Sequence, residues 1–583
     1  MARLIVIDHS LKAAGGHHFD YALRVVSAAE SMGLQTVLAT HRAFQGHAAL
    51  PTNCRLRPVF RHTTYSRFTM FQSSQRRRSF RDKGRFNQVD DEAQEQGMSR
   101  RLWNAGRQRH IQRFARDCQA LLRQESLESG DHVFLPTISE LDLLGLSRFL
   151  QTHDETCRAI WHLQFHFGFL HGWEPDHKSQ HDRLEMTRSY FSTAMKPLLG
   201  HQVYCYNTSE GLAQQYNQLK VAEFQPLSYP INPALKKRVW KSTDGRPLRV
   251  TVAGAVRPEK GQQALAGIVA DLWHEYLRPG RVQLVVQTKH SRWTGRPRLS
   301  VPIPHDGMST DRAAPIVYVP HPLDMPHYEQ LIRETDIGLL LYDPHRYSVR
   351  RAGILCEYLM AGVPSVVPAG CWLGDQISEP IQQYLRPLWN DSIRITPERI
   401  ESLSLPCKSG AAIRRSVPRG SRALLLRVAC QPGAGRYRRL RVVQYGADND
   451  ALVNESRIVG GDWRGGAMLA LTQLQPQARS YQLSVFDETS AVETDRFEVQ
   501  LKWLDAECRY TTRPLGQVGW AAADVEQMSS GLKEIVNNYP HYQQTAAAFS
   551  SVWLARHDPR RTVRELMARP LALQASLPSQ DAA

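Results

Sequence analysis

The residues best suited to chemistry lie in two segments that are far apart in the sequence. In "GAVRPEKG", which runs from Gly254 to Gly261, Arg257 and Lys260 follow an apolar stretch that predicts a strand. A loop between a strand and a helix gathers unpaired backbone N–H groups at the positive end of the helix dipole. Two cations beside such groups form a site suited to a diphosphate. A solvated basic loop is the competing interpretation.

The second segment, "YSVRRAGILCEYLMAGVPSVVP", begins with arginines and carries a carboxylate inside a helical pattern. If the helix begins near Arg351, Gly353 and Glu357 lie four residues apart on one face, while apolar residues cover the core side. A glycine lets a phosphate or sugar approach the backbone closely, and an ionised carboxylate can accept two hydrogen bonds from a ribose diol. We therefore expect Arg350, Gly353 and Glu357 to bind a nucleotide.

The elements that must position these residues follow a strand, helix, strand order. "RLIVID", a glycine loop, an amphipathic helix ending at Gly33 and "QTVLAT" form a first βαβ unit, and further units follow. The first half is thus predicted to be a doubly wound parallel sheet, interrupted at about 62–128 by an arginine-rich insertion. A second series begins near residue 236. Two Rossmann-like halves in tandem place a ligand cleft between them, at the carboxyl ends of both sets of strands.

From about residue 406 the hydrophobic period changes to two, and short strands are separated by Gly, Pro, Asn and Asp turns. This pattern predicts an antiparallel β-sandwich, and because helices return after it, the sandwich is expected to be an insertion into the second half. The expected domains are 1–235, an acceptor domain; 236–405 plus 508–570, a nucleotide-sugar domain; 406–507, the inserted sandwich; and 571–583, a tail.

Together, "GAVRPEKG" and "YSVRRAGILCEYLMAGVPSVVP" resemble segments of the retaining glycosyltransferases of family 4, which have the α/β GT-B fold of two facing Rossmann domains. The resemblance extends to "GGHHFDYALRVVSAAESMG" and "YNTSEGLAQQYN", and it covers most of both halves but neither insertion. It implies that Gly254, Arg257 and Lys260 hold the donor diphosphate and that Glu357 binds the nucleotide ribose.

The sequence departs from this family at two positions. Many members carry a second glutamate eight residues before the helix glutamate, where this chain has Val349, and the serine of their Ser-Gly pair is Ala352 here. In the family that first glutamate contacts the transferred sugar. The resemblance therefore bears on the nucleotide more than on the sugar.

The first half is expected to present a polar group to the reacting carbon. In "AIWHLQFHFG", His162, Gln164 and His166 share one strand face, and a parallel strand buried on both faces would be apolar throughout. The polar face is therefore expected to line the cleft, with His166, nearest the carboxyl end, bonded to the donor sugar. Core histidines satisfied by their neighbours are the competing interpretation.

A glycine loop near the start of the chain, "GGHH", supplies Gly15, Gly16, His17 and His18. We expect these loop residues to contact the acceptor or the donor phosphate, and ordinary loop histidines are the alternative. We expect no metal and no cofactor, because the only Asp-x-Asp motif, at 448–450, lies between predicted strands in a turn pattern. The nine scattered cysteines contain no Cys-x-x-Cys pair and indicate a reducing cytosol.

These observations predict an enzyme that moves a hexose from a nucleotide-diphosphate-sugar to a glycan or lipid-linked acceptor, with retention of anomeric configuration, in surface polysaccharide biosynthesis. Charge would grow on the leaving diphosphate and be stabilised by Arg257 and Lys260, and a leaving-group oxygen would take the acceptor proton, as the family resemblance implies. The alternative is a non-catalytic carbohydrate-binding protein on a decayed GT-B frame. Val349 favours that alternative, whereas the intact Arg257, Lys260 and Glu357 argue against it.

The formal charge of +17 and the pI near 9.6 imply attraction to polyanions. Nucleic acid is not expected as a partner, because the sequence lacks a recognition motif and an aromatic-basic platform. The basic run "QRRRSFRDKGR" is either a solvated insertion or a contact with an anionic membrane surface. No apolar run reaches the length of a membrane span, and Asp8 interrupts the first one. We expect a cytoplasmic protein, with peripheral contact at the inner face of the membrane as a second option.

Overall fold

The computed structural model describes most of the chain: residues 3–66, 68–69, 100–170, 180–237, 245–289, 314–390, 400–406, 412–428, 438–459, 468–486, 496–505, 518–522 and 524–569. The basic run "QRRRSFRDKGR" lies outside the described residues. No helix among the described residues has the length and apolarity needed to span a membrane.

The first domain is built on a seven-stranded parallel sheet in the order β3-β2-β1-β4-β5-β6-β7. Its strands are β1 (Arg3–Asp8), β2 (Gln35–His41), β3 (Arg55–Phe60), β4 (His132–Leu135), β5 (Ile160–Phe165), β6 (Gln202–Asn207) and β7 (Phe224–Pro226). Its helices are α1 (Gly16–Ser31), α4 (Arg100–Leu122), α5 (Glu140–Leu150), α6 (His181–Met195) and α7 (Glu210–Asn217). The apolar sides of α4 to α7 share one buried cluster, and α1 lies in another. The helices therefore cover both faces of the sheet, as its apolar strands require.

The second domain repeats this plan with a six-stranded parallel sheet in the order β10-β9-β8-β11-β12-β21. The strands are β8 (Leu248–Val252), β9 (Val282–Thr288), β10 (Ile316–Pro320), β11 (Ile337–Leu339), β12 (Ser365–Pro368) and β21 (Gly519–Ala522). Its helices are α8 (Leu265–Leu272), α9 (Met325–Arg333), α10 (Gly353–Met360), α11 (Trp372–Asn390), α12 (Val525–Asn537) and α13 (Tyr539–His557), and α14 (Pro559–Met567) follows them in the chain. Both sheets reverse their strand order beside the first strand, and this switch point is where ligands bind in doubly wound folds.

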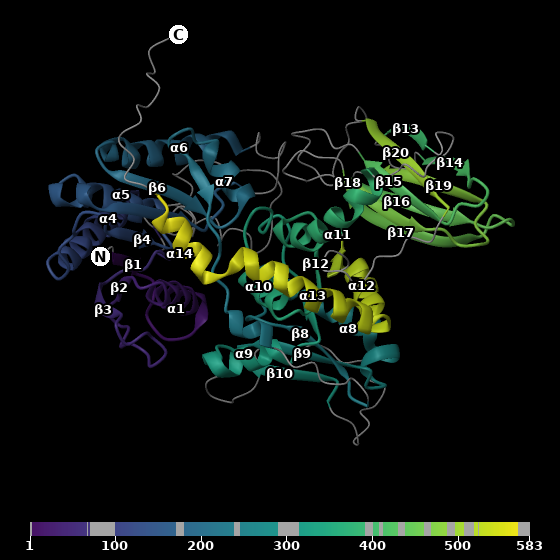
Figure 1. The fold of residues 1–583 in the computed structure, drawn as a ribbon, viewed down its shortest axis with the longest axis horizontal. Coiled ribbons are helices and arrows are strands. Elements are labelled where there is room, and N and C mark those ends of the chain that lie inside the picture. The colour runs from purple at the N-terminus through teal and green to yellow at the C-terminus, as the bar shows by residue number, and fades with distance from the viewer. Residues whose placement is uncertain are drawn as a thin grey trace, which may run out of the picture.

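A β-sandwich separates β12 from β21 along the chain, although these two strands pair directly. One sheet has the order β13-β20-β15-β18 and the other β14-β19-β16-β17, and the pairs described are antiparallel. The strands are β13 (Ile400–Pro406), β14 (Ala412–Ser416), β15 (Ala423–Val428), β16 (Arg438–Tyr445), β17 (Ala451–Val459), β18 (Met468–Gln473), β19 (Ser480–Phe486) and β20 (Arg496–Leu504). The sandwich packs on α11 and lies at the right of Figure 1, at the opposite end of the horizontal long axis from the first domain. The predicted fold class, GT-B with an inserted antiparallel sandwich, is confirmed.

The chain crosses between the two Rossmann-like domains twice. The first crossing follows β7, and the second runs from α13 into α14, drawn in yellow in Figure 1. The crossings touch, because the N–H of Ile231 donates to the carbonyl of His557 at 3.1 Å. Val563 and Leu566 of α14 then enter the core that surrounds α1. The last helix thus completes the first domain, although the sequence groups residues 508–570 with the second.

Candidate functional site

A cleft of about 510 Å³ lies between the two Rossmann-like domains. A volume of this order suits a ligand of nucleotide-sugar size. The cleft brings together predicted residues from both halves of the chain: Gly15, Gly16, His17, His166, Gly254, Arg257, Lys260, Arg350, Gly353 and Glu357. His18 does not line it directly but hydrogen-bonds to Tyr65, which does. Residues separated by more than three hundred positions in the sequence therefore face one space.

The loop after β8 is held by backbone geometry that requires glycine. Gly254 has a φ of +75°, and its N–H donates to the Gln287 side chain at 2.7 Å. At Gly261, with φ of +71°, a Cβ would lie 2.1 Å from the carbonyl oxygen of Leu341. The helix that follows this loop begins at Leu265 and not directly at Gly261, because a short 3₁₀ turn at Pro258–Lys260 comes first. The helix dipole is therefore displaced by about one turn from the predicted diphosphate site.

The cationic side of the cleft is built on this loop. The ammonium group of Lys260 lies 5.0 Å from the centre of the Tyr342 ring, a cation–π contact that fixes its position. Arg257 lines the cleft beside it, as does His321. Burial, with Lys260 and Arg257 adding to it, lowers the pKa of His321. The imidazole is therefore neutral at pH 7, and the positive charge of this side comes from the Lys and Arg side chains.

The start of α10 faces the same space. Ala352 is its N-cap and offers no side-chain hydrogen bond, so the first N–H groups of the helix are not capped by that residue. A Cβ placed on Gly353 would meet its nearest heavy atom, the Tyr229 hydroxyl oxygen, at 3.6 Å. The protein itself therefore has room for a side chain at this position, and glycine keeps that room open to the cleft.

Glu357 lies one turn further along α10. Its Oε2 accepts a hydrogen bond from the Tyr328 hydroxyl at 2.5 Å, and α9 positions Tyr328 because Asp324 caps that helix. Burial, and next the nearby carboxylate of Asp20, raise the pKa of Glu357 to about 8, although the Tyr328 hydrogen bond opposes them. The expectation of an ionised carboxylate is therefore wrong for the protein alone at pH 7, where the carboxyl group is mostly protonated.

The residues before α10 connect the domains. The guanidinium carbon of Arg350 lies 5.6 Å from the ring centre of Phe167 in the first domain and 5.4 Å from that of Tyr347. Val349 is 4% exposed and belongs to the apolar core of the first domain. The position compared in the sequence analysis with a sugar-contacting glutamate is therefore part of an interdomain packing contact.

The polar face predicted on β5 lies mostly in the core, so that prediction is wrong for two of its three residues. His162 and Gln164 are fully buried. The His162 ring stacks on His132 of β4 at 5.2 Å, and Gln164 accepts a hydrogen bond from the Tyr21 hydroxyl at 2.8 Å. Only the third residue of this face, beyond the end of the strand, reaches the cleft.

That third residue is His166. Its Nε2 lies 2.5 Å from the carbonyl oxygen of Pro136, which can only accept, so Nε2 carries the proton. Burial, with His18 adding to it, lowers the pKa of His166 to about 3. The ring is thus neutral, and its Nδ1 is left as a hydrogen-bond acceptor.

His17 and His18 were expected in a loop, but they form the first turn of α1, which begins at Gly16. Gly15 supplies the turn into the helix with a φ of +94°. The Nδ1 of His18 lies 3.0 Å from the Asp8 carboxylate, and both histidines contact the Tyr65 hydroxyl, at 3.0 and 3.1 Å. The histidines therefore belong to a hydrogen-bonded group at the cleft wall.

Several residues at the cleft were not found from the sequence. They are Asp20, Tyr65, Tyr229, Tyr328, Tyr342 and Arg351. Arg351 lies between the rings of Tyr229 and Trp372, at 5.3 and 5.4 Å, and burial lowers its pKa. No motif marks these tyrosines. One available signal was the Asp20 and Arg24 pair, four residues apart on the predicted first helix.

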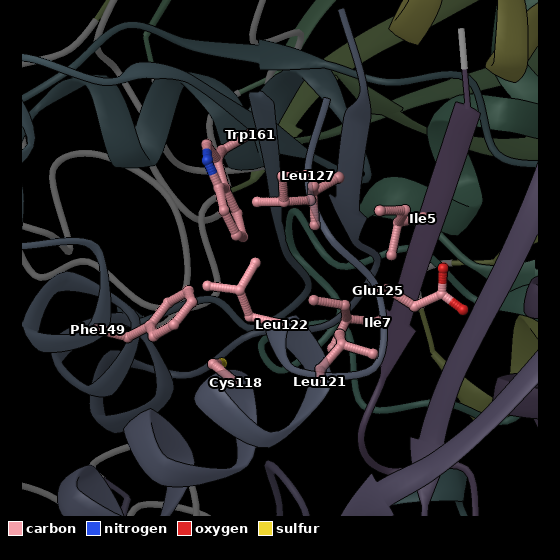
Figure 2. Close-up of a pocket in the computed structure, with 10 residues that line it drawn as sticks. Ile5, Ile7, Cys118, Leu121, Leu122, Glu125, Leu127, Phe149 and Trp161 are labelled. Atoms are coloured by element: carbon pink, nitrogen blue, oxygen red, sulfur yellow. The ribbon is translucent and has the colours of Figure 1, made fainter. Parts of the chain in front are cut away.

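A second, much smaller cavity lies in the core of the first domain (Figure 2). Figure 2 shows the rings of Phe149 and Trp161 and several aliphatic side chains pointing into it, whereas the Glu125 carboxylate points away. That carboxylate pairs with Arg55 at 3.1 Å and Arg57 at 2.7 Å. The volume is about 20 Å³, close to that of one water molecule, so this cavity is a packing feature and no substrate site.

The chain matches no protein-family model and no curated protein sequence. It is similar to several solved structures. Sucrose-phosphate synthase from Thermosynechococcus elongatus is 12% identical, with a TM-score of 0.39 and coverage of 66% of this chain and 85% of that one. A trehalose-6-phosphate synthase is 12% identical, with a TM-score of 0.41 and coverage of 65% of this chain and 87% of that one.

A UDP-forming α,α-trehalose-phosphate synthase from Burkholderia xenovorans is 15% identical, with a TM-score of 0.39 and coverage of 65% of this chain and 86% of that one. At these scores the similarity assigns neither a substrate nor a mechanism to this chain. Membership of glycosyltransferase family 4 stays a prediction.

Proposed function

We propose that the protein is a retaining glycosyltransferase that moves a hexose from a nucleotide-diphosphate-sugar to a glycan or lipid-linked acceptor. The observation that carries the proposal is the convergence of Arg257, Lys260, Gly353 and Glu357 on one interdomain cleft. These are the groups that a diphosphate and a ribose need, and the two sequence segments that supply them follow the adjoining strands β8 and β11 of the second sheet.

The chemistry follows from where charge develops. As the bond to the anomeric carbon breaks, negative charge grows on the leaving diphosphate, and Arg257 and Lys260 lie where they can stabilise it. N–H groups at the start of α10 add to this stabilisation. The Glu357 carboxyl group would bind the ribose diol. Because the cations supply the charge stabilisation, the proposal requires no metal.

The first domain would hold the transferred sugar. His166 offers a neutral Nδ1 acceptor, and Arg350 extends from the second domain to the Phe167 ring. Both domains therefore contribute to the reacting end of the cleft, so bringing them together would orient the donor and exclude water. Val349 cannot act as a sugar ligand, because it is packed in the core.

The direct test is a thermal-shift panel of UDP-, GDP-, ADP- and TDP-sugars, followed by detection of released nucleotide and NMR of the product anomer. We expect one nucleotide class to raise the melting temperature and the α or β configuration of its sugar to be kept. No stabilisation by any of these donors, well above typical KM values, would overturn the proposal.

A non-catalytic carbohydrate-binding protein is the second candidate. The burial of Val349 favours it, because no carboxylate takes the place of the first family glutamate at that position. This candidate predicts glycan binding without nucleotide release, and nucleotide binding that Glu357→Ala does not change.

We also propose surface-polysaccharide assembly as the setting, with peripheral contact at an anionic membrane. On α4, Arg109, Arg113 and Arg116 are exposed at positions that share one helix face. Each basic side chain near an anionic surface contributes about 1 kcal/mol. Co-sedimentation with phosphatidylserine vesicles, and its absence with phosphatidylcholine vesicles, would support this contact. Equal sedimentation with both would contradict it.

A further inference from the structure

A chain of three hydrogen-bonded side chains runs from the core of the first domain to the wall of the cleft. Asp8, at the end of β1, is 1% exposed, and its Oδ2 lies 3.0 Å from Nδ1 of His18. The second oxygen of this carboxylate accepts the N–H of Ser10 at 3.1 Å. The Nε2 of His18 then lies 3.0 Å from the hydroxyl of Tyr65, which lines the cleft.

The donors and acceptors in this chain can be assigned from its chemistry. A carboxylate only accepts, so the Asp8 contact places a proton on Nδ1 of His18 and leaves Nε2 as an acceptor. The Tyr65 hydroxyl can then donate to Nε2. His17, whose Nε2 lies 3.1 Å from the same hydroxyl oxygen, is able to donate to it. Tyr65 therefore keeps a lone pair that can face the cleft.

The ring of Tyr65 is held in place by its neighbours. It packs edge-on against Phe167 at 5.9 Å and against His18 at 5.5 Å. Although 38% of Tyr65 is exposed, the partial loss of water around its hydroxyl at the cleft wall raises its pKa, which Arg350 opposes, so the group is a hydroxyl at neutral pH. The charged and titratable groups around it are Asp8 on β1, His17 and His18 on α1, and Arg350 before α10. His166, beyond β5, is neutral.

We propose that Tyr65 takes the proton of the acceptor hydroxyl and passes its own proton to His18, with Asp8 orienting the imidazole. This inference rests on the proposed transferase function. It differs from the expectation that a leaving-group oxygen takes this proton, because the acceptor proton would leave toward the first domain.

The acceptor oxygen forms a bond to the anomeric carbon, while the bond from that carbon to the diphosphate oxygen breaks and leaves its electron pair on the diphosphate. The acceptor proton moves to the Tyr65 oxygen, and the Tyr65 proton moves to Nε2 of His18. The resulting imidazolium is stabilised by the Asp8 carboxylate until the proton is released to water.

The test compares Tyr65→Phe with wild type in two measurements. The first is the melting shift given by the best donor from a UDP-, GDP-, ADP- and TDP-sugar panel. The second is the rate of nucleotide release from that donor with water as acceptor. We expect an unchanged melting shift and a kcat that falls about a hundredfold, a typical contribution of acid–base catalysis. Tyr445→Phe, which removes a hydroxyl in the sandwich, is the matched control.

A second variant separates proton transfer from structure. His18→Ala is expected to lose activity and to regain part of it with added imidazole, whereas imidazole should not change the rate of the Tyr65→Phe variant. A Tyr65→Phe variant that keeps more than half of the wild-type kcat would overturn the inference and leave the transferase proposal standing, as would a His18→Ala variant that imidazole does not rescue. Absence of nucleotide binding in the wild type would overturn both.

Discussion

The hydroxyl of Ser209 in the first domain donates a hydrogen bond to the backbone carbonyl of Val349 in the second, at 2.5 Å. The same hydroxyl accepts the N–H of Leu212 and so caps α7. The Val349 side chain meanwhile packs into the first domain, 3.7 Å from the position that a Cβ on Gly168 would take. One residue pair thus joins a helix cap, an interdomain hydrogen bond and an apolar contact.

Ser209→Ala should lower stability, because it removes both the cap and the interdomain hydrogen bond. Each is worth about 1 kcal/mol, so we expect a loss of about 2 kcal/mol in the free energy of unfolding. Urea unfolding followed by circular dichroism measures it. Ser189→Ala, on the exposed side of α6, is the control, and an equal effect of both variants would contradict this account.

Val349→Glu places a carboxylate at the position where glycosyltransferase family 4, which the sequence resembles, often has a glutamate, but we expect it to destabilise the protein and not to improve catalysis. A carboxyl group in this apolar site costs several kcal/mol when ionised. Because burial raises the pKa of such a group, the loss of melting temperature should be larger at pH 8 than at pH 5. Val349→Leu serves as the apolar control, and a pH-independent loss would refute the buried placement.

Gly353→Ala tests close approach of a ligand to α10. The protein has room for the added methyl group, so the free energy of unfolding should stay the same or rise by up to about 1 kcal/mol. Nucleotide affinity, measured by calorimetry, should fall about tenfold or more, because the methyl group fills the space that the ligand needs. Gly267→Ala on α8, where a Cβ meets no atom within 4 Å, should leave affinity unchanged. Unchanged affinity in Gly353→Ala would place the ligand elsewhere.

Lys260→Met should weaken nucleotide-diphosphate binding about ten- to a hundredfold, since a charge-assisted hydrogen bond contributes roughly 1.5–3 kcal/mol. The dependence of nucleotide-diphosphate affinity on salt concentration should also become shallower in this variant. The exposed Lys220 offers a matched Lys→Met control in the first domain. If nucleoside monophosphate and diphosphate lose affinity equally, Lys260 does not contact the diphosphate.

Glu357→Gln should stabilise the protein in a pH-dependent manner. The folded-state pKa of about 8 lies above the unfolded value of 4.5, so the folded protein binds the extra proton between these values. Wild-type stability therefore falls as pH rises through this window. The melting temperature of Glu357→Gln minus that of wild type should be near zero at pH 4.5 and positive at pH 8. A difference that does not change with pH would show that folding does not raise the pKa of this carboxyl group.

The same variant should reduce nucleotide affinity, because an amide offers one acceptor oxygen where a carboxylate offers two. A calorimetric titration at pH 8 measures this loss. Tyr328→Phe is a useful comparison, since it removes the hydroxyl that donates to Glu357 and leaves the carboxyl group in place.

Much of the fold could be predicted from the sequence, because both sheets consist of short apolar strands separated by helices whose ends are marked by recognisable residues. Gly33 ends α1 where predicted, whereas the sandwich begins with β13 at Ile400, a few residues before the change of period near residue 406. The two segments around Arg257 and Glu357 are strand-to-helix junctions, and parallel sheets bring such junctions to one edge. Local signals were therefore sufficient to place them together.

The polar face of β5 shows why the remaining site could not be predicted. His132, His162 and Tyr206 form a row of rings across three neighbouring strands, at sequence separations that no local pattern links. Arg569, just beyond α14, lies over Tyr206 at 5.9 Å. A segment from the far end of the chain thus covers a face that would otherwise open to solvent. Likewise, nothing local to Tyr65 or Tyr328 predicts the partners that they meet across the fold.

The two crossings between the domains have a mechanical consequence. Because Ile231 and His557 are bonded to each other, the two crossings lie side by side and would act as one axis if the domains rotated. Tyr229 and Asn232 on the first crossing also line the cleft. A small rotation about this axis would change the width of the cleft. The displacement of a residue would grow with its distance from the axis. Substitutions at the crossings should therefore alter the opening of the cleft more than its chemistry.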